Sequence, residues 1–123
     1  MKNYSNQYGS WTAEERLASL KKTKEAIAKG EIPSQYELGC SICGQRKGRI
    51  DYHNENYSHP TKYLRPLCSR CHLLYHSTRS GTTALWRKYM AYVENNPPLP
   101  PIQNYDKFFK GIREFKYDGD LWD

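Results

Sequence analysis

The chain has 123 residues, enough for one domain or for one small domain with ordered flanks. Hydrophobic residues make up only 37% of it and the mean hydropathy is -0.95, so the core must be thin and a metal, a disulfide or a partner should add stability. The formal net charge of +6 favours a polyanionic partner such as nucleic acid. No apolar stretch approaches the roughly 20 residues of a membrane span, and the start lacks the apolar core of a signal peptide, so we expect no membrane association and a cytoplasmic location.

The first element in chain order is a helix expected over residues 12–29. Thr12 and Glu15 have the spacing of a capping box. Gly30 and the proline that follows it at position 33 are typical of a helix end. A partial apolar face of this helix consists of Leu17, Leu20, Ala26 and Ile27.

The central region should contain turns, a short strand and two helices. Cys40–Gly44 is typical of a tight metal-binding turn, and residues 49–53 alternate like a strand. Residues 67–77 should form a turn that enters a helix, and 83–94 a further helix.

The segment 95–101, Asn-Asn-Pro-Pro-Leu-Pro-Pro, should be a stiff, extended linker. The aromatic tail that follows either packs back on the domain or binds a protein partner. Phe108 and Phe109 could instead contact single-stranded bases. The predicted division is an N-terminal helical extension (1–35), a central domain with its following helix (36–95), and a Pro-rich linker with an aromatic tail (96–123).

The cysteines form two Cys-x2-Cys pairs, Cys40 with Cys43 and Cys68 with Cys71. Two residues between thiolates let one short turn offer two sulfurs to one ion, and four thiolates complete a closed tetrahedron. The spacing therefore predicts a structural Zn²⁺ site. Disulfides are the alternative, although cytosolic cysteine pairs more often hold metal.

Two histidines follow the last cysteine. His72 comes directly after Cys71, and His76 lies four residues later, on the same face of a helix. Two imidazoles at this spacing could hold a divalent ion, or they are surface histidines near a helix end.

These motifs occur in a defined order. Cys-x2-Cys-Gly is followed by His-Asn-Glu-Asn-Tyr-Ser-His-Pro over 53–60, and then by Leu-Cys-Ser-Arg-Cys-His-Leu-Leu-Tyr-His over 67–76. Over about residues 38–78, a third of the chain, this order resembles the zinc-ribbon HNH endonucleases that are common in phages and bacteria.

The resemblance implies a small α+β fold with a ββα-metal (HNH) motif on a four-cysteine zinc ribbon and with flanking helices. It implies that His72 and His76 bind a catalytic ion and that His53 is the catalytic histidine at the strand end. The ion would be Mg²⁺ or Mn²⁺, although imidazole ligands also suit Ni²⁺, Co²⁺ or Zn²⁺. The implied function is a DNA endonuclease that nicks or cleaves phosphodiester bonds in a bacterial or phage-infected cell.

The chain departs from the family pattern at the strand end. Many relatives have His-His or Asp-His there, whereas here His53 is followed by Asn54, which cannot be a general base. The role of His53, as base or as metal ligand, therefore stays open. Glu55 either assists the metal, orients His53, or is simply a turn carboxylate. We count Asn54 and Glu55 with the candidate catalytic residues.

Positive charge is concentrated in the same region. Residues 40–88 contain nine Lys or Arg and two acids, a net charge of +7, so the rest of the chain sums to about −1. Contacts to the DNA backbone are expected from Arg46, Lys47, Arg49, Lys62, Arg65 and Arg70. A solvated basic surface is the alternative.

Two other functions compete with catalysis. A catalytically inactive zinc-ribbon module would keep the metal and the basic residues and would bind DNA without cleaving it. A protein-interaction adaptor would act through the Pro-rich segment and the aromatic tail.

Overall fold

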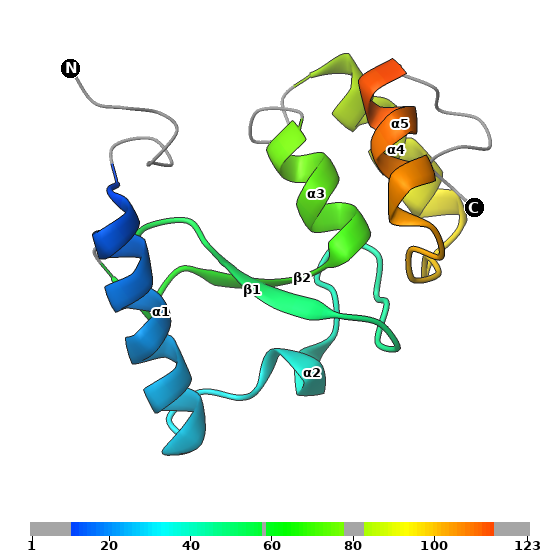
Figure 1. Cartoon of the computed structure of the whole chain (residues 1–123). Coiled ribbons are helices and arrows are strands. Elements are labelled where there is room, and N and C mark those ends of the chain that lie inside the picture. Colours follow the sequence, from blue (N-terminus) through cyan, green and yellow to red (C-terminus); the bar gives the residue numbers. More distant parts are fainter. Residues whose placement is uncertain (1–10, 58, 78–82, 115–123) are drawn as a thin grey trace. The chain divides into compact units, whose positions relative to one another are not determined.

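The computed structural model describes residues 11–57, 59–77 and 83–114, with side chains as far as Ile112. Figure 1 shows the order of the elements along the chain. They are α1 (Ala13–Ala28), α2 (Gln35–Leu38), β1 (Ile50–Asn54), β2 (Leu64–Cys68), α3 (Ser69–Ser77), α4 (Ala84–Asn95) and α5 (Tyr105–Glu114). β1 and β2 form a two-stranded antiparallel sheet, which confirms the small α+β class.

The chain divides into two compact units. The first holds the described residues of Met1–Ser34 and His53–Arg65, and the second holds those of Gln35–Tyr52 and Pro66–Asp123. This division differs from the predicted one in two respects. The loop between the strands belongs with α1, and the Pro-rich segment and α5 belong with the cysteines.

In the first unit, α1 begins and ends where its local sequence predicts. The Thr12 side chain accepts a hydrogen bond from the Glu15 backbone N–H at 3.1 Å, and the Glu15 carboxylate accepts one from the Thr12 N–H at 2.9 Å. This reciprocal pair is a capping box. After Ala28 the chain turns at Gly30, whose φ of 76° favours glycine.

The buried face of α1 is polar rather than apolar. Leu17 and Leu20, which belong to the predicted partial apolar face, are 65% and 47% exposed. The helix buries Ser19, Thr23 and Ala26 instead. Hydrogen bonds to the end of β1 and to the loop after it explain why polar residues are buried here. Thr23 Oγ1 donates to the Pro60 carbonyl at 2.8 Å, and Ser19 Oγ accepts from the Asn54 amide at 3.0 Å.

In the second unit, the apolar core surrounds the cysteines. Ile50 of β1, Leu67 of β2 and Leu74 of α3 are fully buried, and they share one cluster with all four cysteines. α4 adds Tyr89 and two aliphatic side chains to the same cluster. The predicted helix over 83–94 is confirmed, with Thr83 as its N-cap.

The Pro-rich segment belongs to this core as well. Leu99 is only 2% exposed, and its carbonyl accepts a hydrogen bond from the Gln45 side chain at 3.1 Å. The aromatic tail continues as α5, a helix that was not predicted from the sequence. Phe108 is buried in the core cluster, whereas Phe109 is 39% exposed.

In the part of the chain that the structure describes, we find no helix with both the length and the apolar character to span a bilayer.

Leu67 provides a test of this core. Replacing it with alanine should lower the free energy of unfolding by about 2–5 kcal/mol, because Leu67 is 0% exposed and truncation leaves a cavity. Replacing the exposed Leu17 with alanine should change the same quantity by no more than about 0.5 kcal/mol. Urea denaturation of the metal-loaded protein would measure both, and equal losses would contradict the arrangement.

Candidate metal centre

Two backbone turns present the four sulfurs. In the first, the Gly44 N–H donates to the Cys40 carbonyl at 3.0 Å, and the φ of 82° at Gly44 allows the tight bend. In both turns the sulfur of the first cysteine accepts a backbone N–H: Cys43 donates to Cys40 Sγ at 3.5 Å and Cys71 donates to Cys68 Sγ at 3.4 Å. Such N–H···S contacts favour thiolates and orient metal ligands.

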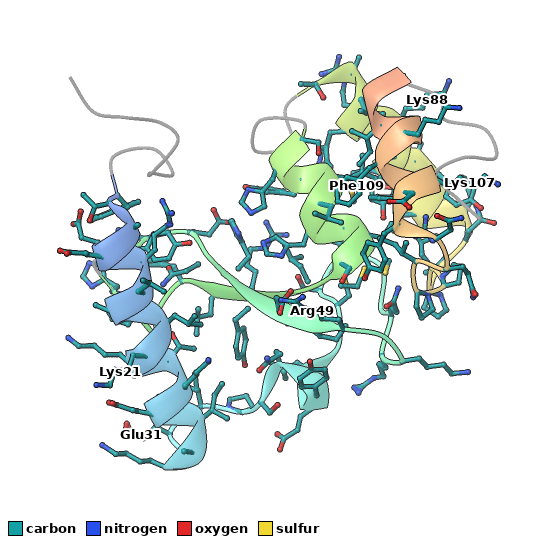
Figure 2. The ribbon with its side chains drawn as sticks, in the orientation of Figure 1. Lys21, Glu31, Arg49, Lys88, Lys107 and Phe109 are labelled. Atoms are coloured by element: carbon teal, nitrogen blue, oxygen red, sulfur yellow. The ribbon has the colours of Figure 1, made fainter. Side chains whose placement is uncertain are left out.

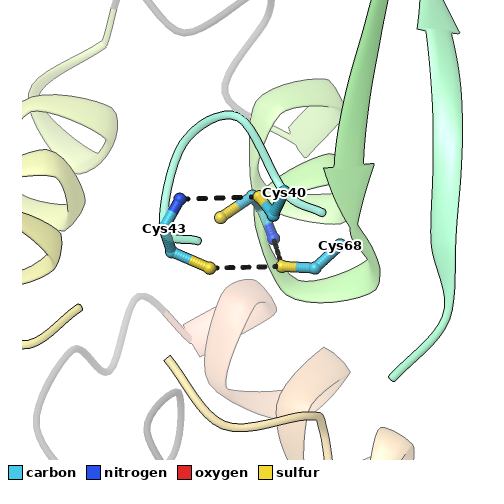
Figure 3. Close-up of side chains that lie close together, drawn as sticks. Cys40, Cys43 and Cys68 are labelled. Carbon is cyan, nitrogen blue, oxygen red and sulfur yellow. Dashed lines mark hydrogen bonds between the residues drawn. The ribbon is translucent and has the colours of Figure 1, made fainter. Parts of the chain in front are cut away.

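The four sulfurs converge on one point. All four cysteines are free and buried, and their sulfur atoms lie within 4.8 Å of one another. Figure 3 shows the Cys43 and Cys68 thiols side by side, with their sulfur atoms 3.7 Å apart. A tetrahedral zinc with Zn–S bonds of about 2.3 Å requires neighbouring sulfurs about 3.8 Å apart. The residues therefore form a site that could hold a metal ion such as zinc.

The thiols shift one another's acidity. The hydrogen bond with Cys43 lowers the pKa of the Cys40 thiol. The hydrogen bond with Cys40, together with burial, raises the pKa of Cys68 and of Cys71. Four thiolates in this volume need a compensating positive charge, and a divalent cation would let all four ionise.

The predicted histidine pair is brought together on α3. His72 Nε2 and His76 Nε2 are 3.0 Å apart, and the His72 side chain is 23% exposed. The other ring nitrogen of His72 faces Asp51 of β1, with Nδ1 3.9 Å from the carboxylate. The contact with His72 and the Arg49 guanidinium hold the pKa of Asp51 below its usual range.

His53 lies at the end of β1, in the first unit, and its side chain is 10% exposed. It shares one face of the strand with Asp51, two residues earlier. Its Nε2 lies 3.5 Å from the Glu55 carboxylate, which also meets Arg65 at 3.4 Å. Glu55 is therefore in position to orient His53.

Asn54 points to the opposite face of β1 and is buried. Its amide donates to Ser19 Oγ at 3.0 Å, and its carbonyl oxygen accepts from the Asn56 N–H at 2.8 Å. These contacts fix the turn and anchor α1. They give Asn54 a structural role, and its place among the catalytic residues stays a prediction.

The predicted DNA contacts divide into exposed and buried side chains. Arg46, Lys47 and Lys62 are exposed, and Arg65 is half-buried beside Glu55. Arg49, which is labelled in Figure 2, is 70% exposed and pairs with Asp51 at 3.0 Å. Arg70 is only 1% exposed, so it cannot reach a DNA backbone in this fold, and the prediction for Arg70 is corrected.

Two residues at the site were missed from the sequence. The alternation of side chains along β1 could have placed Asp51 on the same strand face as His53. The contact of Asp51 with His72 on α3 had no signal in the local sequence. Tyr89 lies 3.2 Å from Cys71 Sγ, and burial raises the pKa of its phenol well above the usual value. Nothing in the sequence of α4 marks this contact, because the two residues are 18 positions apart.

Comparisons of the chain with protein-family models, with curated proteins and with solved structures found no match.

The thiol cluster should bind one Zn²⁺ or Co²⁺ per chain. Because protons compete for the thiolates, the affinity should fall as the pH falls. Cys68→Ser should weaken binding by more than the roughly 10- to 100-fold cost of losing an outer-shell partner. The thiolate-to-Co²⁺ charge-transfer absorption, followed during titration against a chelator at several pH values, would measure this. His59→Ala is the control, and oxidised cysteines or unchanged binding by Cys68→Ser would contradict the site.

Proposed function

We propose that this protein is a metal-dependent DNA endonuclease of the HNH type, in which His72, His76 and His53 hold or serve a catalytic ion. The proposal is carried by the convergence of His72 and His76, whose Nε2 atoms lie 3.0 Å apart. Two imidazole nitrogens bound at right angles to one ion, each at about 2.1 Å, would be about 3.0 Å apart. The pair therefore has the spacing of two ligands of the same ion.

The order of the elements supports the same proposal. β1, β2 and α3 follow one another in the chain, which is the order of a ββα-metal motif. In the second unit, the cysteines of the proposed zinc ribbon lie on the turn before β1 and across the junction of β2 with α3.

His53 is proposed as the third member of this site on the basis of strand register. Asp51 and His53 share one face of β1, and residues two apart on a strand are separated by about 6.6 Å. Asp51 meets His72 at 3.9 Å. The register of β1 therefore supports His53, on the strand face that carries Asp51, as base or as ligand.

The chemistry would be hydrolysis of a phosphodiester bond. A bound Mg²⁺, Mn²⁺ or similar ion would polarise the scissile phosphate and stabilise the leaving oxygen. His53 would take a proton from the attacking water while the water oxygen bonds to phosphorus, and Glu55 would hold the imidazole in position. Asp51 would hold the Nδ1 side of His72, which leaves Nε2 for the ion.

Exposed or half-buried basic side chains would bind the DNA backbone. Contacts of this kind give an affinity that falls with salt, and they carry little sequence information. The proposed set is Arg46, Lys47, Arg49, Lys62 and Arg65.

A second candidate function is a DNA-binding or protein-binding zinc module without catalysis. The observation in its favour is the structural use of Asn54, which leaves the strand end with one histidine in place of the pair found in many relatives. Exposed Tyr105 and Phe109 on α5 would then be available to a protein partner.

Nicking of supercoiled plasmid tests the first candidate. The wild type should nick DNA with added Mg²⁺ or Mn²⁺, and Ni²⁺ or Co²⁺ should be tried in parallel. His53→Ala should reduce the rate by about 10²–10⁴-fold, the usual contribution of a general base. His72→Ala and His76→Ala should abolish the metal dependence.

His59→Ala is the matched control, because His59 is exposed and lies outside the proposed site. If the wild type binds DNA but does not nick it with any of these ions, the noncatalytic module is the correct function. Removal of the residues after Ile112 should leave nicking intact if the tail only recruits a partner.

The salt dependence of DNA binding tests the basic side chains separately from catalysis. Lys47→Ala should weaken binding to all DNA sequences alike and lower the slope of log affinity against log salt by about one. Lys29→Ala, outside the basic region, should leave the slope unchanged. Fluorescence anisotropy with a labelled duplex would measure the slopes, and equal slopes for all three proteins would remove Lys47 from the interface.

A further inference from the structure

Arg70 occupies an unusual position. Its side chain is among the largest fully buried side chains in the described chain, although it carries a permanent positive charge. Its Nε donates to the Pro100 carbonyl at 3.3 Å, and its guanidinium carbon lies 5.4 Å from the centre of the Phe108 ring. Both terminal nitrogens, Nη1 and Nη2, are buried without a hydrogen-bond partner among the described residues. A buried charge in this state is strongly destabilising unless opposite charge lies nearby.

With a metal bound, cysteines close to Arg70 in the sequence would supply that opposite charge. Arg70 lies between Cys68 and Cys71, two of the four metal-binding cysteines. Four thiolates around one divalent ion leave two net negative charges in the same buried core. No carboxylate forms an ion pair with Arg70 within the described ranges, so the thiolate cluster is the anion that would offset its charge.

Tyr89 contacts one of these cysteines directly. The residue is 0% exposed, and its hydroxyl oxygen lies 3.2 Å from Cys71 Sγ. A metal-bound thiolate can only accept, so the phenol O–H would donate to it. Hydrogen bonds to ligating sulfurs withdraw charge from them and hold them in position.

Tyr89 and the contact partners of Arg70 belong to the same part of the chain, residues 83–114, which we call the C-terminal arm. It contains α4, the Pro-rich segment and α5. Tyr89 reaches Cys71 from α4, and Arg70 reaches back to Pro100 and Phe108. The arm also contacts the residue that follows the other cysteine turn, because the Gln45 side chain donates to the Leu99 carbonyl at 3.1 Å. The arm thus contacts the chain at or next to both turns that carry the metal ligands.

We propose that Tyr89 and Arg70 form the outer shell of the four-cysteine centre and couple metal binding to the docking of the C-terminal arm. The bound metal creates the anionic cluster that offsets Arg70 and accepts the Tyr89 hydrogen bond. The docked arm in turn raises the affinity of the cysteines for metal. Coupling of this kind is reciprocal, since each event must stabilise the other to the same extent. The proposal is independent of the nuclease function.

Tyr89→Phe tests the hydrogen bond with little change in shape. It should lower the Zn²⁺ affinity by about 10- to 100-fold, the usual cost of losing an outer-shell partner. Tyr92→Phe on the same helix is the matched control and should leave the affinity unchanged. Competition between the protein and a chromophoric chelator would measure the affinity, and far-UV circular dichroism would verify that both variants fold.

Hydrogen exchange tests the coupling to the arm. Amides of α4 and α5 in the wild type should be protected with Zn²⁺ bound and should lose protection when the metal is chelated. Arg70→Met should lower both the Zn²⁺ affinity and this metal-dependent gain in protection, whereas Arg70→Lys should keep part of each because it keeps the charge. Arg87→Met, an exposed site on α4, is the control.

An unchanged Zn²⁺ affinity in Tyr89→Phe, or arm protection that is the same with and without metal, would overturn the proposal. If Arg70→Met does not fold, Tyr89→Phe and the wild-type exchange experiment still decide it. Plasmid nicking plays no part in these readouts, so failure of the nuclease proposal would leave their outcome unaffected.

Discussion

The convergence of four buried sulfurs is the constraint on which the second unit depends. Cys40 and Cys43 come from a turn before the hairpin, and Cys68 and Cys71 come from the junction of β2 with α3, so the cluster joins segments separated by 24 residues. Without a cation, ionised thiols this close would repel one another, and neutral thiols would give only weak hydrogen bonds. With a divalent ion the same four groups become a cross-link. In a chain with a mean hydropathy of -0.95, that cross-link would supply stability that the apolar core alone would not.

Features determined by neighbouring residues could be predicted from the sequence. The capping box of Thr12 and Glu15 places the start of α1, and the Cys-x2-Cys spacing places both cysteine turns. The spacing of His72 and His76 places their rings together because a helix brings residues four apart onto one face. In each case the signal and the structure lie within one helical turn or one backbone turn, so no knowledge of distant partners was needed.

Features determined by distant residues could not be predicted in the same way. Leu17 is exposed because α1 faces a polar loop, where Ser19 and Thr23 find hydrogen-bond partners. The Pro-rich segment suggests a linker by composition, yet Leu99 is buried in the core cluster, and Gln45, 54 residues away, donates to its carbonyl. Arg70 is basic and suggests a DNA contact, yet its helix turns it into the core. Charge and composition describe a residue, whereas burial depends on what the rest of the chain places over it.

Helix α3 connects the thiol cluster to the histidine pair. Cys71 is held by the cluster and by the 3.2 Å contact with Tyr89, and the next residue, His72, is turned by about 100° around the helix axis toward Asp51. Rotation of α3 about its own axis would separate His72 from Asp51, and the anchoring of Cys71 opposes that rotation. His76 follows one turn later on the same rigid element, so its distance to His72 is set by the helix itself. The four-cysteine cluster can therefore position the imidazoles of His72 and His76 without contacting them, because a side chain on a fixed helix is held more firmly than one on a loop.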